Sequence, residues 1–471
     1  MDFLYQQIAK NIELKINSQV LRIGDKLPSV REICREQGVS MSTALEAYYF
    51  LEGMGLIESR PKSGYYVSNL IKRKIAVPEI SNPGSIADYN QTEMLIDKVF
   101  HGFHSEDSVL FSVGVPTKEF LPVARLNKLL TKAIHELPGS GTQYENVQGN
   151  ERLRRQIART SIHWGGHLQA EDLVITSGCM DALCVSLMVA TRPGDTIAVE
   201  SPVYFGLLQL AQSLGRRIIE MPTDPVTGID LGSLKKLLTY EKVHAVFVIS
   251  NFNNPLGSCM PEENKRELVK MLTEKNIPII EDDIYADLYF GNHRPKSCKS
   301  FDTEGNVIWC GSISKTLAPG YRVGWVAPGR FKSKLIRQKL YTSVSSATLQ
   351  QQVVATFLES GRYENHLRKM RYSLHSNYLK MTGCIVENFP ENIKLGKPQG
   401  GFVLWIELPE HLNTIELLDI LMKEKISIAP GRVFTLQDQY LNCMRLSFGL
   451  DWNEHVEKAL TRIGEICLKS S

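Results

Sequence analysis

The sequence has no long hydrophobic run. Of its 471 residues, 43% are hydrophobic and 22% are charged. No apolar stretch approaches the roughly 20 residues that a helix needs to cross a bilayer. The polar residues near the start, Gln6 and Gln7, do not fit the apolar centre of a secretory signal peptide. We therefore expect a cytoplasmic protein.

Paired cysteines are also missing. The nine cysteines include no CxxC pair and no His/Cys cluster with the spacing of metal ligands. Such an odd, scattered set indicates reduced thiols in a reducing compartment. The pattern excludes a disulfide scaffold and predicts no metal site.

A strong excess of charge of one sign is absent, because the formal net charge is only +3. Residues 1–74 hold 11 Lys and Arg against 8 Asp and Glu, whereas the remainder holds 43 of each. This local excess is a modest indication of a polyanionic partner, although the surface of any small domain can carry it. The length exceeds one ordinary core and favours roughly two to four domains.

The N-terminal segment has the pattern of three short helices. Apolar residues recur at every fourth position in the first of them: Leu4, Ile8, Ile12 and Ile16. Ser29 and Glu32 form an S-x-x-E capping box for a second helix, which ends at Gly38. Ser40 can cap a third helix that ends at Gly53. Two short helices joined by a turn containing glycine predict a helix-turn-helix.

Two short β-prone runs follow, at 56–60 and 65–67, around Pro61–Gly64, and they predict a hairpin wing. The whole segment resembles the GntR family of winged helix-turn-helix regulators through Gly24–Glu32, Gly38–Ser40, Ala47–Tyr48, Gly55–Leu56 and Ser63–Val67. The resemblance implies DNA contacts by seven residues: Arg31, Ser40, Ser42, Thr43, Lys62, Ser63 and Gly64. Arginine suits phosphate or guanine, and hydroxyls at a helix start suit phosphate. Plain helix capping explains Ser40 and Thr43 equally well.

A connector is predicted at residues 69–92, which lack an apolar period and are rich in charge and chain-breaking residues. Its basic triplet Lys72–Lys74 can assist DNA binding, although a solvated linker explains it as well. The connector separates residues 1–68, which we call the reader domain, from residues 93–471.

From about residue 173, short apolar strands alternate with helices. The strand-like runs are Leu173–Thr176, Thr196–Glu200, Arg217–Met221, Ala245–Ser250, Pro278–Asp282 and Val307–Gly311. Strands that are apolar throughout and separated by helices predict an α/β fold with a mainly parallel sheet. Ligands of such sheets bind at the carboxyl ends of the strands.

Polar residues with matching chemistry follow three of these strands. Lys315 lies among small residues and can form a Schiff base with an aldehyde, while Ser312 and Arg322 can donate to a phosphate. A carboxylate at Asp282 can keep a pyridine nitrogen protonated, and the amide of Asn254 can donate to a phenolic oxygen. Taken singly, each residue has an ordinary structural explanation. Lys315 is typical of a surface lysine, Asp282 of a helix cap and Asn254 of a turn.

Together the motifs resemble the fold-type I aminotransferases from about Phe111 to the C-terminus, above all in the run Ser312–Trp325. The resemblance implies pyridoxal phosphate as cofactor and a Schiff base at Lys315. It implies cofactor contacts by eleven residues: Asp282, Tyr285, Asn254, Tyr204, Ser312, Ser314, Arg322, Gly178, Cys179, Met180 and Tyr144. It further implies that Arg445 grips the carboxylate of an amino-acid effector.

A GntR-type reader domain ahead of an aminotransferase-like domain resembles the MocR subgroup of GntR regulators. The resemblance implies a head-to-tail homodimer, with a large subdomain at about 111–330 and a small one at about 331–471. Our first hypothesis is a regulator that binds promoter DNA and senses a vitamin B6 or amino-acid effector. The alternative is an active aminotransferase with an accessory reader domain. A sensor without cofactor is disfavoured, since Lys315, Asp282 and Arg445 are all present.

Overall fold

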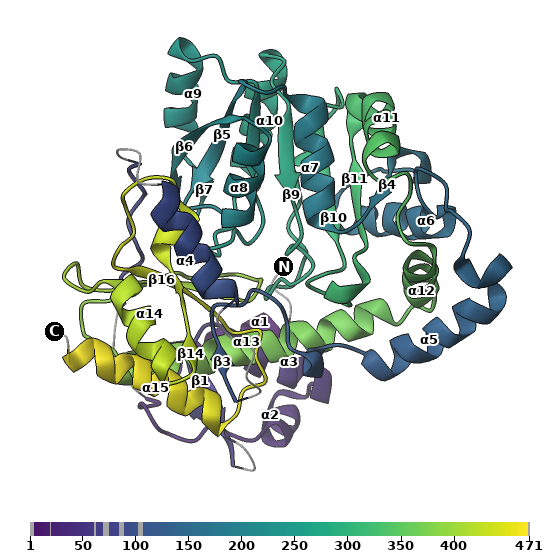
Figure 1. Cartoon of the computed structure of the whole chain (residues 1–471). Coiled ribbons are helices and arrows are strands. Elements are labelled where there is room, and N and C mark those ends of the chain that lie inside the picture. The colour runs from purple at the N-terminus through teal and green to yellow at the C-terminus, as the bar shows by residue number, and fades with distance from the viewer. Residues whose placement is uncertain are drawn as a thin grey trace.

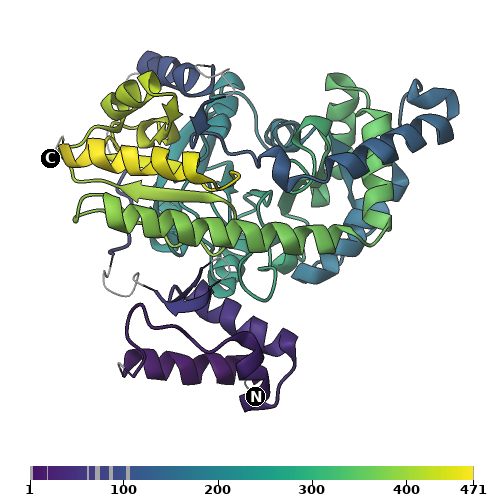
Figure 2. The same cartoon turned by 90° about the horizontal axis from the view of Figure 1, so that it is seen from below.

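The computed structural model describes residues 4–18, 20–60, 63–68, 75–83, 89–101 and 107–469. Lys62 and the triplet Lys72–Lys74 lie outside these residues, so their predicted roles stay predictions. The N-terminal reader domain forms a small body beside a larger α/β body (Figures 1 and 2). Within the described residues, no helix combines the length and apolarity needed to cross a membrane.

The reader domain contains three helices and a hairpin: α1 (Leu4–Asn17), α2 (Val30–Gln37), α3 (Met41–Gly53), β1 (Ile57–Arg60) and β2 (Gly64–Val67). The predicted capping box is confirmed, because Ser29 N donates to Glu32 Oε2 at 2.6 Å and Glu32 N donates to Ser29 Oγ at 3.3 Å. The strands pair antiparallel as the predicted wing. One detail differs: Leu4 is 54% exposed, and the neighbouring Tyr5 packs into the core in its place.

The larger body is built on an eight-stranded sheet in the order β4-β11-β10-β9-β8-β5-β6-β7. Its strands are β4 (Val174–Thr176), β5 (Thr196–Ser201), β6 (Arg217–Asp224), β7 (Gly228–Ile229), β8 (Ala245–Val248), β9 (Ile279–Asp282), β10 (Val307–Ser312) and β11 (Gly324–Ala327). The five central strands from β10 to β6 run parallel, which confirms the predicted fold class. The sequence patterns did not predict β7 and β11. Strand β7 pairs antiparallel at one edge of the sheet, and β11 lies antiparallel between β10 and the edge strand β4.

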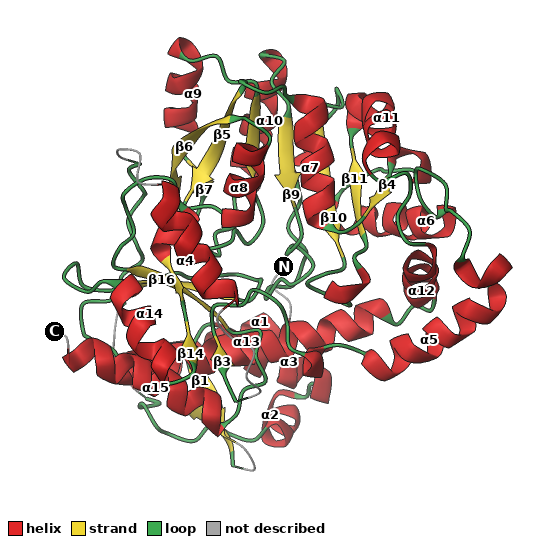
Figure 3. Ribbon diagram, in the orientation of Figure 1, coloured by secondary structure: helices red, strands yellow, loops and turns green. Residues whose placement is uncertain are grey.

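Helices cover both faces of this sheet (Figure 3). They are α5 (Val123–Glu136), α6 (Glu151–Thr160), α7 (Cys179–Ala190), α8 (Phe205–Ser213), α9 (Leu231–Tyr240), α10 (Glu262–Glu274), α11 (Lys332–Thr342) and α12 (Thr348–Glu359). Strands buried on both faces explain the continuous apolar runs in the sequence. Separate apolar clusters join the sheet to α7 and α8, to α9 and α10, and to α5, α6 and α12.

The small subdomain has an antiparallel sheet in the order β12-β13-β16-β15. Its elements are β12 (Lys394–Leu395), β13 (Val403–Glu407), β14 (Ile426–Ser427), β15 (Ala429–Pro430), β16 (Cys443–Ser447), α13 (Tyr363–Asn388), α14 (Thr414–Lys423) and α15 (Glu454–Lys469). Two earlier segments, α4 (Tyr89–His101) and β3 (Val109–Leu110), pack into its apolar core. Because α11 and α12 pack on the large sheet, the packing boundary lies near α13 rather than near residue 331.

Part of the predicted connector is fastened to the larger body. Leu395 N donates to Ala76 O at 3.0 Å, and Thr223 N donates to Ser81 Oγ at 2.8 Å. Helix α4 starts at Tyr89, before the predicted end of the connector at residue 92. The connector is therefore more ordered than its composition indicated, because its backbone and one hydroxyl find partners on distant strands.

Candidate cofactor site and nucleic-acid interface

The predicted cofactor residues meet at the carboxyl ends of the parallel strands. Asp282 ends β9, Ser312 ends β10, and Asn254 lies in the turn that follows β8. Tyr204 follows β5, and Gly178 lies between β4 and α7. Parallel strands bring these positions to one edge of the sheet, although they are far apart in the sequence.

Lys315 is a half-buried lysine at this edge of the sheet. Its Nζ donates to the backbone oxygen of Gly114 at 2.5 Å and lies 5.8 Å from the ring centroid of Tyr285. Burial, and then the positive charge of Arg445, lower the pKa of Lys315 to about 8. A lysine that releases its proton so near neutral pH is suited to attack an aldehyde.

Asp282 is the buried carboxylate of the site. Its Oδ1 accepts hydrogen bonds from the Cys179 thiol at 3.4 Å and from Ile284 N at 3.1 Å. Burial raises the pKa of Asp282 to about 6, so the side chain is mostly ionised at neutral pH. A carboxylate with few donors around it is suited to pair with a protonated ring nitrogen.

Arg445 is a buried cation that faces polar groups of the same site. Its Nη1 donates to Asn254 Oδ1 at 3.1 Å, and its Nη2 donates to Ser112 O. The amide of Asn254 also reaches the Tyr285 hydroxyl at 3.4 Å. Among the described residues Arg445 Nε has no hydrogen-bond partner, and the partners of the guanidinium are an amide oxygen and a backbone oxygen rather than a carboxylate. Because an uncompensated buried charge is costly, this arrangement fits a ligand that brings its own carboxylate.

Phosphate donors converge where α7 begins. A Cβ atom added to Gly178 would lie 2.4 Å from Arg322 Nη2, so the guanidinium closes over this glycine. Gly178 itself has a φ of 89°, which a side chain would disfavour. Ser312 and Ser314 are buried nearby on the segment that carries Lys315. An arginine, two hydroxyls and the first amides of a helix are the donors that a phosphate requires.

Burial raises the pKa of Tyr204. The charges of Arg445 and Asp282 also act on its hydroxyl, so Tyr204 lies near the same groups. The Cys179 side chain turns toward Asp282, which leaves only its amide for phosphate. Met180 is half-buried in the first turn of α7. Tyr144 stands apart from the cluster, with 86% of its surface exposed.

Sequence reasoning missed two backbone groups of this site and the contact that the side chain of Cys179 makes with Asp282. The carbonyl oxygens of Ser112 and Gly114 accept from Arg445 and Lys315, and the Cys179 thiol donates to Asp282. Every residue has a carbonyl, so the first two leave no signal in the sequence. The position of Cys179 at the start of a predicted helix was the only available indication of the third.

Glu200, one residue before the end of β5, is a buried acid beside this site. Its Oε2 accepts from Ile249 N at 2.7 Å and from Asn253 Nδ2 at 2.9 Å. Burial raises the pKa of Glu200 to about 8, so the folded chain keeps this proton at pH values where the unfolded chain has released it. The unfolding free energy should therefore fall as pH rises from about 4.5 to about 8.

We expect Glu200→Gln to reduce this pH dependence in the cofactor-free protein. The removed slope is at most about 1.4 kcal/mol per pH unit, the value for one proton. Urea unfolding at several pH values between 5 and 8 measures it. Glu274→Gln, at an exposed position on α10, is the matched control. Equal slopes in wild type and Glu200→Gln would contradict the assignment of this proton.

The reader domain presents its candidate DNA residues to solvent. Arg31, Ser40, Ser42, Ser63 and Gly64 are exposed, and Thr43 is half-buried. Ser40 Oγ accepts from Thr43 N at 3.2 Å and lies 2.8 Å from Ser42 Oγ, so Ser40 caps α3 as predicted. Its hydroxyl therefore orders the helix start whether or not it also touches DNA.

Two cations beside Tyr66 of the wing were not predicted as DNA contacts. The guanidinium of Arg60 lies 4.3 Å from the Tyr66 ring centroid, and Lys26 Nζ, from the segment before α2, lies 5.9 Å from it. The Tyr66 hydroxyl is 2.7 Å from Ser63 Oγ. Arg60 is paired with Glu58 at 2.8 Å, so Lys26 provides the positive charge beside the predicted wing contacts that favours a polyanion.

The reader domain also packs against the larger body. The rings of Tyr49 on α3 and Tyr372 on α13 are 5.1 Å apart, and the Tyr5 hydroxyl accepts from Asn292 Nδ2. Figure 2 shows α13 running between the reader domain and α15. These docking residues are different from the exposed candidate DNA residues, so docking leaves the latter free.

Comparisons with known proteins match the two bodies separately. Residues 4–67 match the bacterial regulatory proteins of the gntR family, and residues 106–463 match aminotransferase class I and II. The chain is 37% identical to an uncharacterized HTH-type transcriptional regulator, YjiR, of Escherichia coli, over 98% of both chains. It is 28% identical to the HTH-type transcriptional regulator NorG of Staphylococcus aureus, over 93% of this chain and 98% of NorG.

Solved structures resemble the larger body. The α-aminoadipate aminotransferase LysN of Thermus thermophilus, complexed with N-(5'-phosphopyridoxyl)-L-leucine, superposes with a TM-score of 0.72. It is 27% identical, and the match covers 78% of this chain and 93% of LysN. These matches agree with the site geometry, in which an amine, a carboxylate and phosphate donors converge. The chain therefore belongs to the gntR-family regulators whose reader domain is fused to an aminotransferase class I and II domain, the architecture of the MocR subgroup.

Proposed function

We propose that this chain is a DNA-binding transcriptional regulator that holds pyridoxal phosphate and responds to an amino-acid or vitamin B6 effector. One observation carries the proposal: a full set of cofactor-binding groups lies in the same chain as a reader domain with an exposed DNA-facing side. The proposed partner is promoter DNA. Because this DNA lies in the bacterial cytoplasm, the proposal includes a cytoplasmic location.

Pyridoxal phosphate supplies an aldehyde and an electron-withdrawing ring. Lys315 would provide the amine that holds the aldehyde, and Asp282 would hold a proton at the ring nitrogen. Asn254 and Tyr285 would orient the ring through its phenolic oxygen, and Tyr204 would contact the ring. Arg445 would bind the carboxylate of an amino-acid effector. The proximity of these groups at one edge of the sheet supports these roles.

The phosphate contacts complete the assignment. Ser312, Ser314 and Arg322 donate to the phosphate, with the first amides of α7 from Gly178 onward. The positive end of the helix macrodipole adds attraction for the anion. This end of the site would anchor the cofactor, whereas Arg445 would contact the effector.

The proposed assembly is a head-to-tail homodimer. Exposed apolar side chains gather at the end of α11 and in the segment before α6: Tyr144, Leu340, Tyr341 and Val344. Lys339 Nζ donates to Val147 O at 2.8 Å and so joins these two segments. A second copy would cover this surface and bring Tyr144 to the partner's cofactor site. Two reader domains would also cover two half-sites of an operator.

A mobility-shift assay on the DNA upstream of the chain's own gene tests the function. It should be run with and without pyridoxal phosphate and with a panel of amino acids. We expect salt-sensitive binding that changes when cofactor or effector is added. Failure to bind, or binding that no ligand changes, contradicts the proposal.

Arg31→Ala is expected to weaken DNA binding about 5- to 10-fold. Loss of one phosphate contact should also lower the slope of log affinity against log salt by about one. Titration of labelled DNA at salt concentrations between about 50 and 200 mM would measure both effects. Over this range the affinity of a protein with several phosphate contacts falls roughly 10³-fold or more. Lys10→Ala, at an exposed position of α1, is the control. An unchanged salt slope for Arg31→Ala would remove this residue from the interface.

Transaminase activity is the alternative, and the half-buried Lys315, whose pKa is lowered to about 8, is the observation that favours it. A proton carrier beside the reacting carbon is what such turnover requires. Repeated conversion of an amino acid and an oxo acid at ordinary enzyme rates would make catalysis the main function. A single half-reaction without turnover would leave the chain a regulator.

A further inference from the structure

One chain segment, residues 283–296, touches both the cofactor site and the reader domain. It follows Asp282 directly and includes Tyr285, so its first residues belong to the cofactor site. Farther along, Asn292 Nδ2 donates to the hydroxyl of Tyr5 on α1. The segment therefore spans the distance between the two functional parts of the chain.

A second contact lies beside the first. The Phe290 ring stacks on His375 of α13, with centroids 4.8 Å apart and planes 25° apart. The same histidine lies against α3, because a Cβ atom added to Gly53 would be 2.8 Å from His375 Cε1. Both Phe290 and Asn292 thus belong to the surface on which the reader domain is seated.

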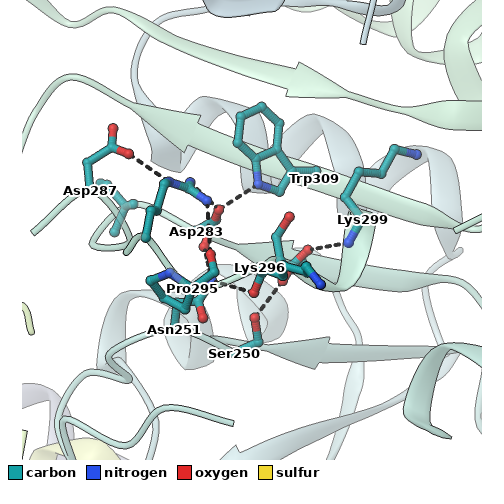
Figure 4. Close-up of polar contacts among 12 residues, drawn as sticks. Ser250, Asn251, Asp283, Asp287, Pro295, Lys296, Lys299 and Trp309 are labelled. Atoms are coloured by element: carbon teal, nitrogen blue, oxygen red, sulfur yellow. Dashed lines mark hydrogen bonds and ion pairs between the residues drawn. The ribbon is translucent and has the colours of Figure 1, made fainter. Parts of the chain in front are cut away.

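Arg294 closes the segment on itself by contacting two carboxylates, Asp283 and Asp287, which are labelled in Figure 4. Arg294 Nη2 donates to Asp283 Oδ2 at 2.7 Å, and Arg294 Nε donates to Asp287 Oδ1 at 2.7 Å. The arginine side chain is only 6% exposed, and that of Asp283 is fully buried. Buried ion pairs of this geometry hold both ends of a loop in one position.

Asp283 is further tied to both neighbouring strands. It accepts from Asn251 Nδ2, after β8, at 2.7 Å and from Trp309 Nε1, on β10, at 2.8 Å. The far end is held by Lys265, whose Nζ donates to Lys296 O at 2.7 Å and to Asn251 Oδ1 at 2.6 Å. The segment is therefore anchored at both ends, and its middle projects to the reader domain.

We propose that segment 283–296, closed by Arg294, is the element through which occupancy of the cofactor site changes the placement of the reader domain. A ring held by Asp282 and Tyr285 selects one position of the segment, and the contacts of Asn292 and Phe290 pass that position to α1 and α3. The inference rests on the proposed function. A ligand shifts such an equilibrium only through contacts that differ between the two states, and a bound ring would make its contact with this segment at Tyr285.

The test uses full-length protein with Asn292→Ala or Tyr5→Phe, each of which removes the contact between Asn292 and Tyr5. Neither residue belongs to the cofactor site or to the DNA-facing side. Affinity for labelled upstream DNA is measured by fluorescence anisotropy with and without pyridoxal phosphate. Affinity for pyridoxal phosphate is measured by visible absorbance with and without DNA. Because coupling between two ligands is reciprocal, both pairs must give the same ratio.

We expect both variants to bring this ratio close to one. Cofactor absorbance, and DNA affinity without cofactor, should stay within about twofold of wild type, since the binding groups themselves are intact. Tyr372→Ala is the matched control, because it weakens docking of the reader domain through the contact with Tyr49, to which segment 283–296 contributes no residue. Its ratio should remain that of wild type.

Three outcomes overturn the inference. A wild-type ratio in Asn292→Ala and Tyr5→Phe would show that the segment does not carry the coupling. Loss of the ratio in Tyr372→Ala alone would assign the coupling to α13. A ratio of one in the wild type would instead contradict the proposed function, and the inference would fall with it.

Discussion

Lys315→Ala is expected to abolish the visible absorbance of the protein after it is mixed with pyridoxal phosphate. The lysine at this position is half-buried, and removal of its amine from water, together with the charge of Arg445, lowers the pKa of Lys315 to about 8. At pH 7 about a tenth of such amines are unprotonated, against roughly one in three thousand for an ordinary lysine.

The measurement is an absorbance spectrum after gel filtration. Lys296→Ala, whose side chain is on the surface and paired with Glu262, is the matched control and should keep its colour. In wild type, colour should develop about tenfold faster per pH unit below pH 8 and level off above it, because only the neutral amine reacts. Colour retained by Lys315→Ala would move the attachment to another lysine.

Arg445→Lys is expected to weaken binding of amino-acid effectors roughly 10- to 100-fold while leaving cofactor absorbance intact. The substitution keeps a positive charge but loses the two-pronged guanidinium that matches a carboxylate. A hydrogen bond to a charged group contributes about 1.5–3 kcal/mol, and each 1.4 kcal/mol is about tenfold in affinity. Burial lowers the pKa of Arg445 to about 10, so it is still charged at neutral pH.

Titration of the cofactor spectrum with amino acids measures this effect. The ligand control is the set of matching amines that lack the carboxylate, whose binding should change little. The protein control is Arg462→Gln on α15, which breaks surface ion pairs with Glu424, just after α14, and with Glu465. If Arg445→Lys weakened acids and amines equally, Arg445 would not be the carboxylate group.

Local hydrogen bonds explain why the reader domain could be predicted well. The capping box of Ser29 and Glu32 and the cap at Ser40 join residues three positions apart, so the sequence pattern contains both partners. The central strands were predicted for a similar reason, because burial on both faces requires continuous apolar runs. The motif around Lys315 is a contiguous segment, and its chemistry is visible in the order of its residues.

Other features depend on partners far apart in the chain. The orientation of Cys179 toward Asp282 and the carbonyl acceptors at Ser112 and Gly114 follow from packing across the sheet. The same is true of the packing of α11 and α12 on the large sheet, which placed the subdomain boundary near α13 instead of residue 331. No local pattern distinguishes these contacts from their alternatives.

The amino-acid sequence by itself determined which chemistry the chain carries: a capped reader domain with a wing, and an amine, a carboxylate and phosphate donors at the ends of parallel strands. Only the tertiary structure decided how the two parts meet, through segment 283–296 and through the docking of Tyr49 on Tyr372. The physical reason is range. Caps, turns and apolar periods act between residues a few positions apart, whereas a contact such as that of Tyr5 with Asn292 exists only after the whole core has packed.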